Sequence, residues 1–299
     1  MDKINKDTHH PTAEIVAARL QMSEAIMSTA FSTVSGDYAF YTSSLTEQLV
    51  GSGNNQLMKA ELRQSVELAA STTFNNVWGS TYSNLMNIQQ MIDKVENDVA
   101  SSGGQLDILG AAQLLKAINI GYLTDMHGDV PYSEALSGSD NMQPVLDSQQ
   151  SIYADIIATL DKAIGNLTNA AGMKNLSDQD LVYGGNVNSW LAAAYAAKAR
   201  YLIHQSKVNS SALAQAKEAA NKALELGFSG MQVSDFNGIT CDNPWSAFIW
   251  SRAYTAPSTH VSNLMAANDD PRYDFYNGDA AVDPGDEGYM KARGTSLHS

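Results

Sequence analysis

Apolar residues recur at steps of three and four through most of the first 227 residues, and this spacing limits the fold more than any other feature of the chain. Because an α-helix turns once in about 3.6 residues, such steps put apolar side chains on one face. One such face comprises Trp78, Tyr82, Leu85, Ile88, Ile92, Val95 and Val99. Another comprises Ile152, Ile156, Leu160, Ala163 and Leu167. The spacing predicts amphipathic helices and an all-α fold, with Trp78 and Tyr82 buried.

Two pairs of predicted helices have the arrangement of helical hairpins. Residues 190–206 and 212–226 are separated by a short turn, and small side chains lie along one face of the second helix. A bulky aromatic early in the first helix and small residues in the second are typical of a tetratricopeptide unit. Residues 106–124 and 148–167 form another candidate pair, separated by a long insertion. The sequence thus predicts tetratricopeptide-like helix pairs, although plain helix packing would produce the same spacing.

Several polar residues and one glycine mark the predicted helix ends. Asp147 with Gln150 three positions later matches a capping box and predicts the start of the helix that follows. Gly227 follows the last periodic residue and predicts a glycine C-cap. Asp129 is expected to accept hydrogen bonds from backbone amides in a turn. His204 ends a predicted helix, where a cationic side chain interacts favourably with the helix dipole.

The helical spacing fades after Gly227, where Gly, Pro, Asn, Asp and aromatic residues become frequent. We therefore predict a helical scaffold over residues 1–227. Residues 228–299 are predicted to be a mostly irregular, ligand-facing segment of the same domain, because binding residues commonly lie on loops that a rigid scaffold positions. The candidate ligand contacts in this segment are Trp245, Trp250, Tyr254, Asn243 and Arg252.

These five residues suit a neutral, hydroxyl-rich ligand. Aromatic rings can stack against the C–H faces of a sugar, and an amide or a guanidinium can hydrogen-bond its hydroxyls. Pro244 limits the backbone before Trp245 and favours a presented ring. The alternative is that Trp245, Phe248 and Trp250 form a local cluster that pins the segment. The sequence leaves both interpretations open.

Composition and charge exclude several classes of protein. Apolar residues make up 44% of the chain, which is enough for a core and excludes global disorder. The formal net charge of −14 disfavours nucleic acid and anionic lipid as partners, whereas a neutral solute feels no such repulsion. Cys241 is the single cysteine, so internal disulfides and Cys-rich zinc sites are excluded. No apolar run reaches the length of about 18 residues that a membrane-spanning helix needs.

Motifs for catalysis or metal binding are missing from the sequence. It contains no Gly-x-Ser-x-Gly, P-loop, Gly-x-Gly-x-x-Gly or HExxH pattern. The densest acidic groups are Asp269-Asp270 and the run Asp283, Asp286 and Glu287. Paired carboxylates can serve glycoside hydrolysis, and the Asp283–Glu287 run could hold calcium, although it lacks the EF-hand pattern. We expect no cofactor, with calcium the one ion considered.

The sharpest sequence feature is the run Gly128-Asp129-Val130-Pro131-Tyr132 at the end of a predicted helix. It resembles the hallmark turn of the SusD/RagB-like family. Other matching stretches are Ile4 to Glu14, Trp78-x3-Tyr82, Asp147-Ser148-Gln149-x2-Ile152-Tyr153, Asp180-Leu181-Val182-Tyr183-Gly184-Gly185 and Asn268-Asp269-Asp270-Pro271-Arg272. Together these matches run in order along almost the whole chain.

The resemblance implies a cell-surface lipoprotein of the outer membrane with tetratricopeptide-like helix pairs. Members of the family capture glycans and sit as a lid on a TonB-dependent, SusC-like transporter, and they are not enzymes. The natural form is expected to be lipid-anchored, although the lipid-bearing cysteine is absent here and the family's C-terminal part is expected to be missing. The alternatives from other classes are a helical carbohydrate-active enzyme and a helical-repeat scaffold that binds a protein.

Overall fold

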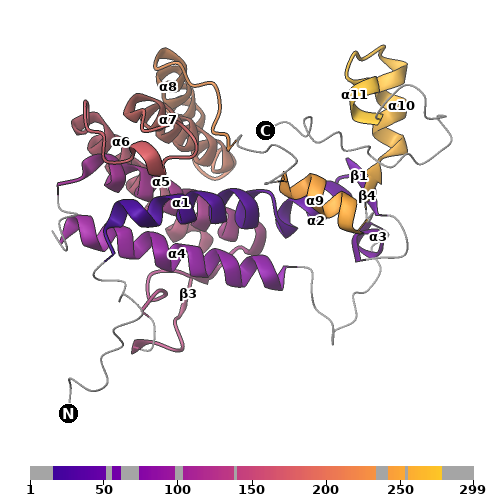
Figure 1. Cartoon of the computed structure of the whole chain (residues 1–299). Coiled ribbons are helices and arrows are strands. Elements are labelled where there is room, and N and C mark those ends of the chain that lie inside the picture. The colour runs from indigo at the N-terminus through magenta and orange to yellow at the C-terminus, as the bar shows by residue number, and fades with distance from the viewer. Residues whose placement is uncertain are drawn as a thin grey trace. The chain divides into compact units, whose positions relative to one another are not determined.

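A computed structural model describes residues 16–51, 56–61, 74–97, 104–137, 140–233, 242–252 and 255–277. These residues are predominantly helical (Figure 1). The chain forms two compact units, of which the first comprises the described residues of Met1–Ala30 and Ser80–Val233. The second comprises the described residues of Phe31–Gly79 and Ser234–Ser299. Residues from both sides of the predicted boundary at 227 therefore meet in the second unit.

The described residues of the first unit form six α-helices, one 3-10 helix and two short strands that pair with each other. Its elements are α1 (Ala18–Ser28), most of α4 (Asn75–Glu96), α5 (Leu106–His127), β2 (Val130–Pro131), β3 (Leu146–Asp147), α6 (Gln149–Asn169), the 3-10 helix η5 (Ser177–Gln179), α7 (Val187–His204) and α8 (Ala212–Glu225). The strands β2 and β3 are antiparallel, with Val130 opposite Asp147.

Helix α5 is the centre of the first unit. It packs against α1, α6 and α7, and most of its residues are buried. A helix that is apolar on all sides needs neighbours on all sides. Helices α5 and α6 form one hairpin and α7 and α8 form the next (Figure 1). The predicted all-α fold with tetratricopeptide-like pairs is confirmed.

The apolar face predicted for α6 is confirmed, because Ile152, Ile156, Leu160, Ala163 and Leu167 are all fully buried. In α4 the described residues Leu85, Ile88, Ile92 and Val95 are also buried, and Val99 lies outside the described residues. Trp78 and Tyr82 are only half-buried, so their predicted burial is wrong. Trp78 and Tyr82 lie about 80° and about 120° around the helix from Ile88, at the edge of the buried face, because 3.6 residues per turn does not match steps of four and three exactly.

The predicted capping box is also wrong. Ser148 is the N-cap of α6, and its Oγ accepts a hydrogen bond from the Ser151 amide. The Asp147 carboxylate instead accepts hydrogen bonds from the amides of Tyr132 and Ser133 at 3.0 and 2.7 Å. The helix begins one residue later than the pattern indicated, so Asp147 lies in β3 and stabilises the turn after β2.

The predicted end of α8 is confirmed at Gly227. The glycine has φ +81°, and its amide donates to the carbonyl of Leu224. The amide of Phe228 donates to the carbonyl of Ala223. This pair of bonds is a Schellman motif, which favours glycine because its central residue is left-handed.

The second unit contains short helices around one small sheet. Its elements are α2 (Asp37–Leu45), β1 (Leu49–Gly51), α3 (Gln56–Glu61), α9 (Pro244–Arg252), β4 (Thr255–Pro257), α10 (Thr259–Ala267) and α11 (Tyr273–Asn277), and the π-helix η2 (Thr29–Val34) leads into it from the first unit. Strands β1 and β4 pair antiparallel, with Val50 opposite Ala256. The expectation of mostly irregular structure after Gly227 is therefore corrected for residues 244–252 and 255–277. Helices of five to nine residues are too short to show a clear 3.6-residue period.

None of the helices in the described part of the chain combines the length and the apolar character that crossing a membrane requires.

Candidate functional site

The candidate ligand segment begins at α9, where Asn243 and Pro244 set the start of the helix. The Asn243 side-chain oxygen accepts a hydrogen bond from the Trp245 amide at 2.9 Å. Proline suits the first helical position because its missing N–H would have no partner within the helix. Asn243 thus acts as a local cap, and Trp245 takes a defined position on the first turn of α9.

Trp245 packs on an aromatic cluster of the second unit. Its ring centroid lies 4.7 Å from that of Phe40, and Phe248 stacks on Phe40 at 4.2 Å. The indole Nε1 donates a hydrogen bond to the carbonyl of Ser35 at 3.0 Å. Trp245 and Phe248 remain half-buried beside the buried core formed by Phe40, Tyr41, Leu57 and Ala60. Trp245 therefore has a packing role, and its exposed part stays available to a ligand.

Of the five predicted ligand contacts, the structure describes the side chains of Asn243 and Trp245, which are joined by a hydrogen bond. Trp250 and Arg252 belong to α9, but their side chains lie outside what the structure describes. Tyr254 lies outside the described residues altogether. The five residues stay a prediction as a ligand site.

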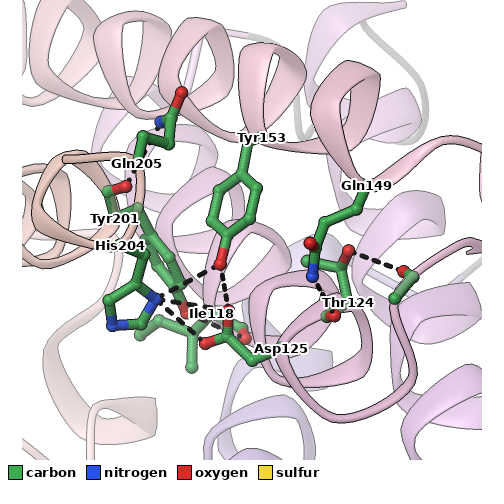
Figure 2. Close-up of polar contacts among 9 residues, drawn as sticks. Ile118, Thr124, Asp125, Gln149, Tyr153, Tyr201, His204 and Gln205 are labelled. Atoms are coloured by element: carbon green, nitrogen blue, oxygen red, sulfur yellow. Dashed lines mark hydrogen bonds and ion pairs between the residues drawn. The ribbon is translucent and has the colours of Figure 1, made fainter. Parts of the chain in front are cut away.

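The hallmark turn after α5, residues 128–132, is held by hydrogen bonds to three helices. Gly128 has φ +77°, and its carbonyl accepts a hydrogen bond from the Thr124 hydroxyl at 2.8 Å. The Asp129 carboxylate accepts one from the Gln149 amide at 2.8 Å; this partner is the first residue of α6, 20 positions along the chain, whereas the prediction was a nearby amide of the turn. The Gln149 side chain donates a hydrogen bond to the carbonyl of Thr124 at 2.7 Å (Figure 2). The Tyr82 hydroxyl donates to the carbonyl of Pro131, so the turn joins α4, α5 and α6.

A polar cluster missed by the sequence analysis lies beside this turn. Asp125, Tyr153 and His204 come from α5, α6 and α7 and point toward one another (Figure 2). The Tyr153 hydroxyl donates to the Asp125 carboxylate, and His204 Nδ1 lies 3.2 Å from the same carboxylate. Burial and the charge of Asp125 raise the pKa of Tyr153 well above its ordinary value, so its hydroxyl stays protonated and donates.

The Asp125–Tyr153–His204 cluster ties three consecutive helices together. His204 is the last residue of α7, as predicted, and its Nδ1 lies beside the Asp125 carboxylate on α5. The three residues are 28, 51 and 79 positions apart, so no local pattern could have found them. The three residues meet because α5, α6 and α7 pack against one another.

Two acidic residues are buried and fully engaged. Asp180 accepts hydrogen bonds from the amides of Val182, Tyr183 and Gly185 and from the indole of Trp190. The buried Asp107 accepts from the amides of residues 175 and 176 and from the Asn175 side chain. A carboxylate with three or four donors can stay in a protein interior. Both therefore hold loops in place.

The acidic groups considered for catalysis or calcium give no such site in the described residues. Asp270 forms a two-pronged ion pair with Arg272 in the turn before α11, with Nε–Oδ1 at 2.9 Å. Hydrogen bonds from Arg272 lower the pKa of Asp270 to about 2, whereas a glycosidase acid needs a raised pKa. The Asp283–Glu287 run lies outside the described residues. Within the described ranges no group of three His, Cys, Asp or Glu side chains could hold a metal ion.

The tetratricopeptide-like hairpins of the first unit define the class of helical-repeat proteins. The chain belongs to the SusD-like family: a family model described as "Starch-binding associating with outer membrane" matches residues 13–296. The resemblance of the sequence motifs to this family is therefore confirmed. A comparison with curated protein sequences finds no match.

Solved structures of the same family share the fold. A SusD/RagB family protein from Bacteroides thetaiotaomicron is 34% identical, with a TM-score of 0.75 over 86% of this chain and 53% of that one. A chitin-binding SusD homologue from Flavobacterium johnsoniae is 22% identical, with a TM-score of 0.63 over 85% and 53%. A SusD homologue from Bacteroides fragilis is 21% identical, with a TM-score of 0.62 over 86% and 52%. The chain spans about half the length of these relatives.

Proposed function

We propose that this chain belongs to a cell-surface, glycan-binding component of an outer-membrane nutrient-uptake complex, and that its partner is a TonB-dependent transporter of the SusC type. The observation that carries the proposal is the family match over residues 13–296, whose description joins starch binding to the outer membrane. The net charge of −14 agrees with a neutral ligand. The natural protein would be lipid-anchored at the cell surface.

The proposed role is binding without catalysis. The family description names binding and membrane association, and the chitin-binding relative is named for binding as well. The acids available in the described residues support this, since Asp180 and Asp107 hold loops and Asp270 is paired with Arg272. A reducing-sugar assay on mixed glycans should therefore detect no hydrolysis above a heat-treated control.

We propose α9 and the residues after it as the ligand-contact region, with Trp245, Trp250 and Tyr254 stacking on the sugar and Asn243 and Arg252 bonding its hydroxyls. Aromatic residues concentrate here, and the Phe40 cluster gives α9 a rigid base. Rigid presentation lowers the entropy cost of binding.

The test combines calorimetry and thermal melts on Trp245→Ala and Trp250→Ala with a glycan identified on an array. Loss of a stacking ring should weaken binding by about 1 kcal/mol or more. Because Trp245 also packs on Phe40, Trp245→Ala should lower the melting temperature, whereas a purely ligand-facing residue should not. If both variants lose stability and keep their affinity, α9 is a packing element and the glycan site lies elsewhere.

A further inference from the structure

An exposed loop of the first unit, between β2 and β3, carries apolar side chains. We call its described residues, 133–137 and 140–145, together with Leu146 at the start of β3, the β2–β3 loop. Figure 1 shows the segment that leads into β3 projecting beyond the helices. Met142 is 80% exposed, Val145 is 55% exposed and Leu146 is 68% exposed. Large apolar side chains grouped in this way favour an interaction surface over a solvated loop.

The loop is held in one conformation although it is exposed. The Glu134 carboxylate accepts hydrogen bonds from the Asn141 side chain at 3.1 Å and from the Val145 amide at 3.3 Å. The Asn141 side-chain oxygen accepts one from the Gln143 amide at 3.0 Å. Leu136 adopts the left-handed conformation with φ +66°, which a branched residue keeps only where its surroundings enforce it. The apolar side chains are therefore presented on a prearranged support, which lowers the cost of binding.

The charge of the segment around the β2–β3 loop indicates which kind of partner would bind it. The segment from Asp129 to Ser148 contains four carboxylates, at positions 129, 134, 140 and 147, and no Lys, Arg or His. Segments that lie on membranes combine apolar side chains with Lys and Arg, so this pattern disfavours a lipid surface. A second copy of the chain would bring the same negative charge to the contact. A glycan would stack on an aromatic ring, and the aromatic residue of this segment, Tyr132, is buried.

We propose that the β2–β3 loop docks into an apolar pocket rimmed by Lys or Arg on a protein partner. The inference rests on the proposed function, and it identifies the partner as the transporter of the uptake complex. Met142, Val145 and Leu146 are the anchors, in line with interfaces where a few apolar side chains carry most of the affinity. The carboxylates around them steer the approach and select a positively charged rim.

The experiment measures how much transporter co-purifies with tagged full-length protein from outer membranes of the native bacterium. Wild type is compared with Met142→Glu/Leu146→Glu, with Asp140→Lys and with Val208→Glu. Val208 lies in the turn between α7 and α8 and is 86% exposed, so this control adds a charge at another exposed apolar position. Glycan affinity and the thermal melt are measured for every variant.

We expect at least about tenfold less transporter to co-purify with Met142→Glu/Leu146→Glu than with wild type. Asp140→Lys should also retain less, while Val208→Glu matches wild type and all variants keep their melts and glycan affinity. Equal recovery by the double variant, or equal loss by Val208→Glu, would overturn the inference and leave the proposed function intact. If wild type itself retains no transporter, the partner in the proposed function is wrong, and the inference falls with it.

Discussion

Single residues stabilise this chain most clearly where a buried carboxylate organises a loop. Asp180 is nearly completely buried, and its two oxygens receive three backbone amides and the Trp190 indole. Trp190 is itself fully buried at the start of α7. One acidic side chain therefore fixes both the loop before α7 and the orientation of the largest residue in the first unit.

Replacing Asp180 tests this role. Asp180→Asn keeps the shape but turns one acceptor oxygen into a donor that faces other donors, so we expect a loss of about 2–4 kcal/mol in the free energy of unfolding. Urea denaturation followed by circular dichroism measures the loss. Asp178→Asn is the matched control because Asp178 is exposed, and it should change stability by less than about 0.5 kcal/mol. Equal effects of the two changes would contradict the role of Asp180.

Helices α5 and α7 of the first unit approach each other closely at Gly121, which has no side chain to separate them. A Cβ built on Gly121 of α5 would lie 2.2 Å from the hydroxyl oxygen of Tyr201 on α7. The Tyr201 side chain is fully buried, and its hydroxyl donates to the carbonyl of Ile118. The ring therefore occupies the space that Gly121 leaves, and this contact sets how α5 and α7 pack.

Adding a methyl group at Gly121 should disrupt that contact. Gly121→Ala is expected to destabilise the protein by about 1–3 kcal/mol through overpacking, despite the better helix propensity of alanine. Gly165→Ala on α6 is the control, because a Cβ there meets nothing within 4 Å. It should stabilise the protein by about 0.5–1 kcal/mol, measured by the same denaturation. A stabilising Gly121→Ala would show that the α5–α7 contact is looser than described.

The start of α6 offers a second test at the level of one element. Ser148→Ala removes the N-cap that receives the Ser151 amide, so we expect a loss of about 1 kcal/mol. Gln150→Ala should be nearly neutral, since Gln150 is exposed and the structure does not use the predicted capping box. Thermal melts of the two variants separate the two capping schemes. A larger loss for Gln150→Ala would favour the capping box that the sequence pattern indicated.

Across the whole molecule, burial of tyrosine hydroxyls couples stability to alkaline pH. Among the described residues, burial raises the pKa of six tyrosines, namely Tyr82, Tyr132, Tyr153, Tyr183, Tyr201 and Tyr276. The folded state therefore holds these phenolic protons more tightly than the unfolded state, whose tyrosines titrate near pH 10. This contribution to stability is fully present below about pH 10 and is lost as the pH rises further.

We therefore expect the protein to unfold in base as its buried tyrosines ionise. Tyrosinate absorbance and helical circular dichroism should change together above about pH 10, because ionisation of these hydroxyls accompanies unfolding. Tyr153→Phe should reduce the steepness of this alkaline loss, since it removes one group with a raised pKa. Full ionisation of all tyrosines near pH 10 with intact helicity would contradict the burial described here.

The sequence by itself determined the all-α class, the buried face of α6 and that of α4 from Leu85 to Val95, the end of α8 at Gly227 and the family. These depend on helical periodicity and on local turn chemistry, which neighbouring residues in the chain contain. Three of the family motifs, at 128–132, 180–185 and 268–272, lie in turns between helices, where local sequence dictates the backbone.

Only the tertiary structure decided which distant residues meet. The partners of Asp125, the pairing of β1 with β4 and the contact of Trp245 with Phe40 each join segments far apart in the chain. Trp78 and Tyr82 had the right spacing, yet the helix they share with Ile88 turns them to the edge of the buried face. Ser148 replaced Asp147 as the N-cap because the turn after β2 already engaged Asp147. Local spacing indicates which side chains can share one face of a helix. Which partner each side chain contacts depends on the packing of segments that lie far apart in the chain.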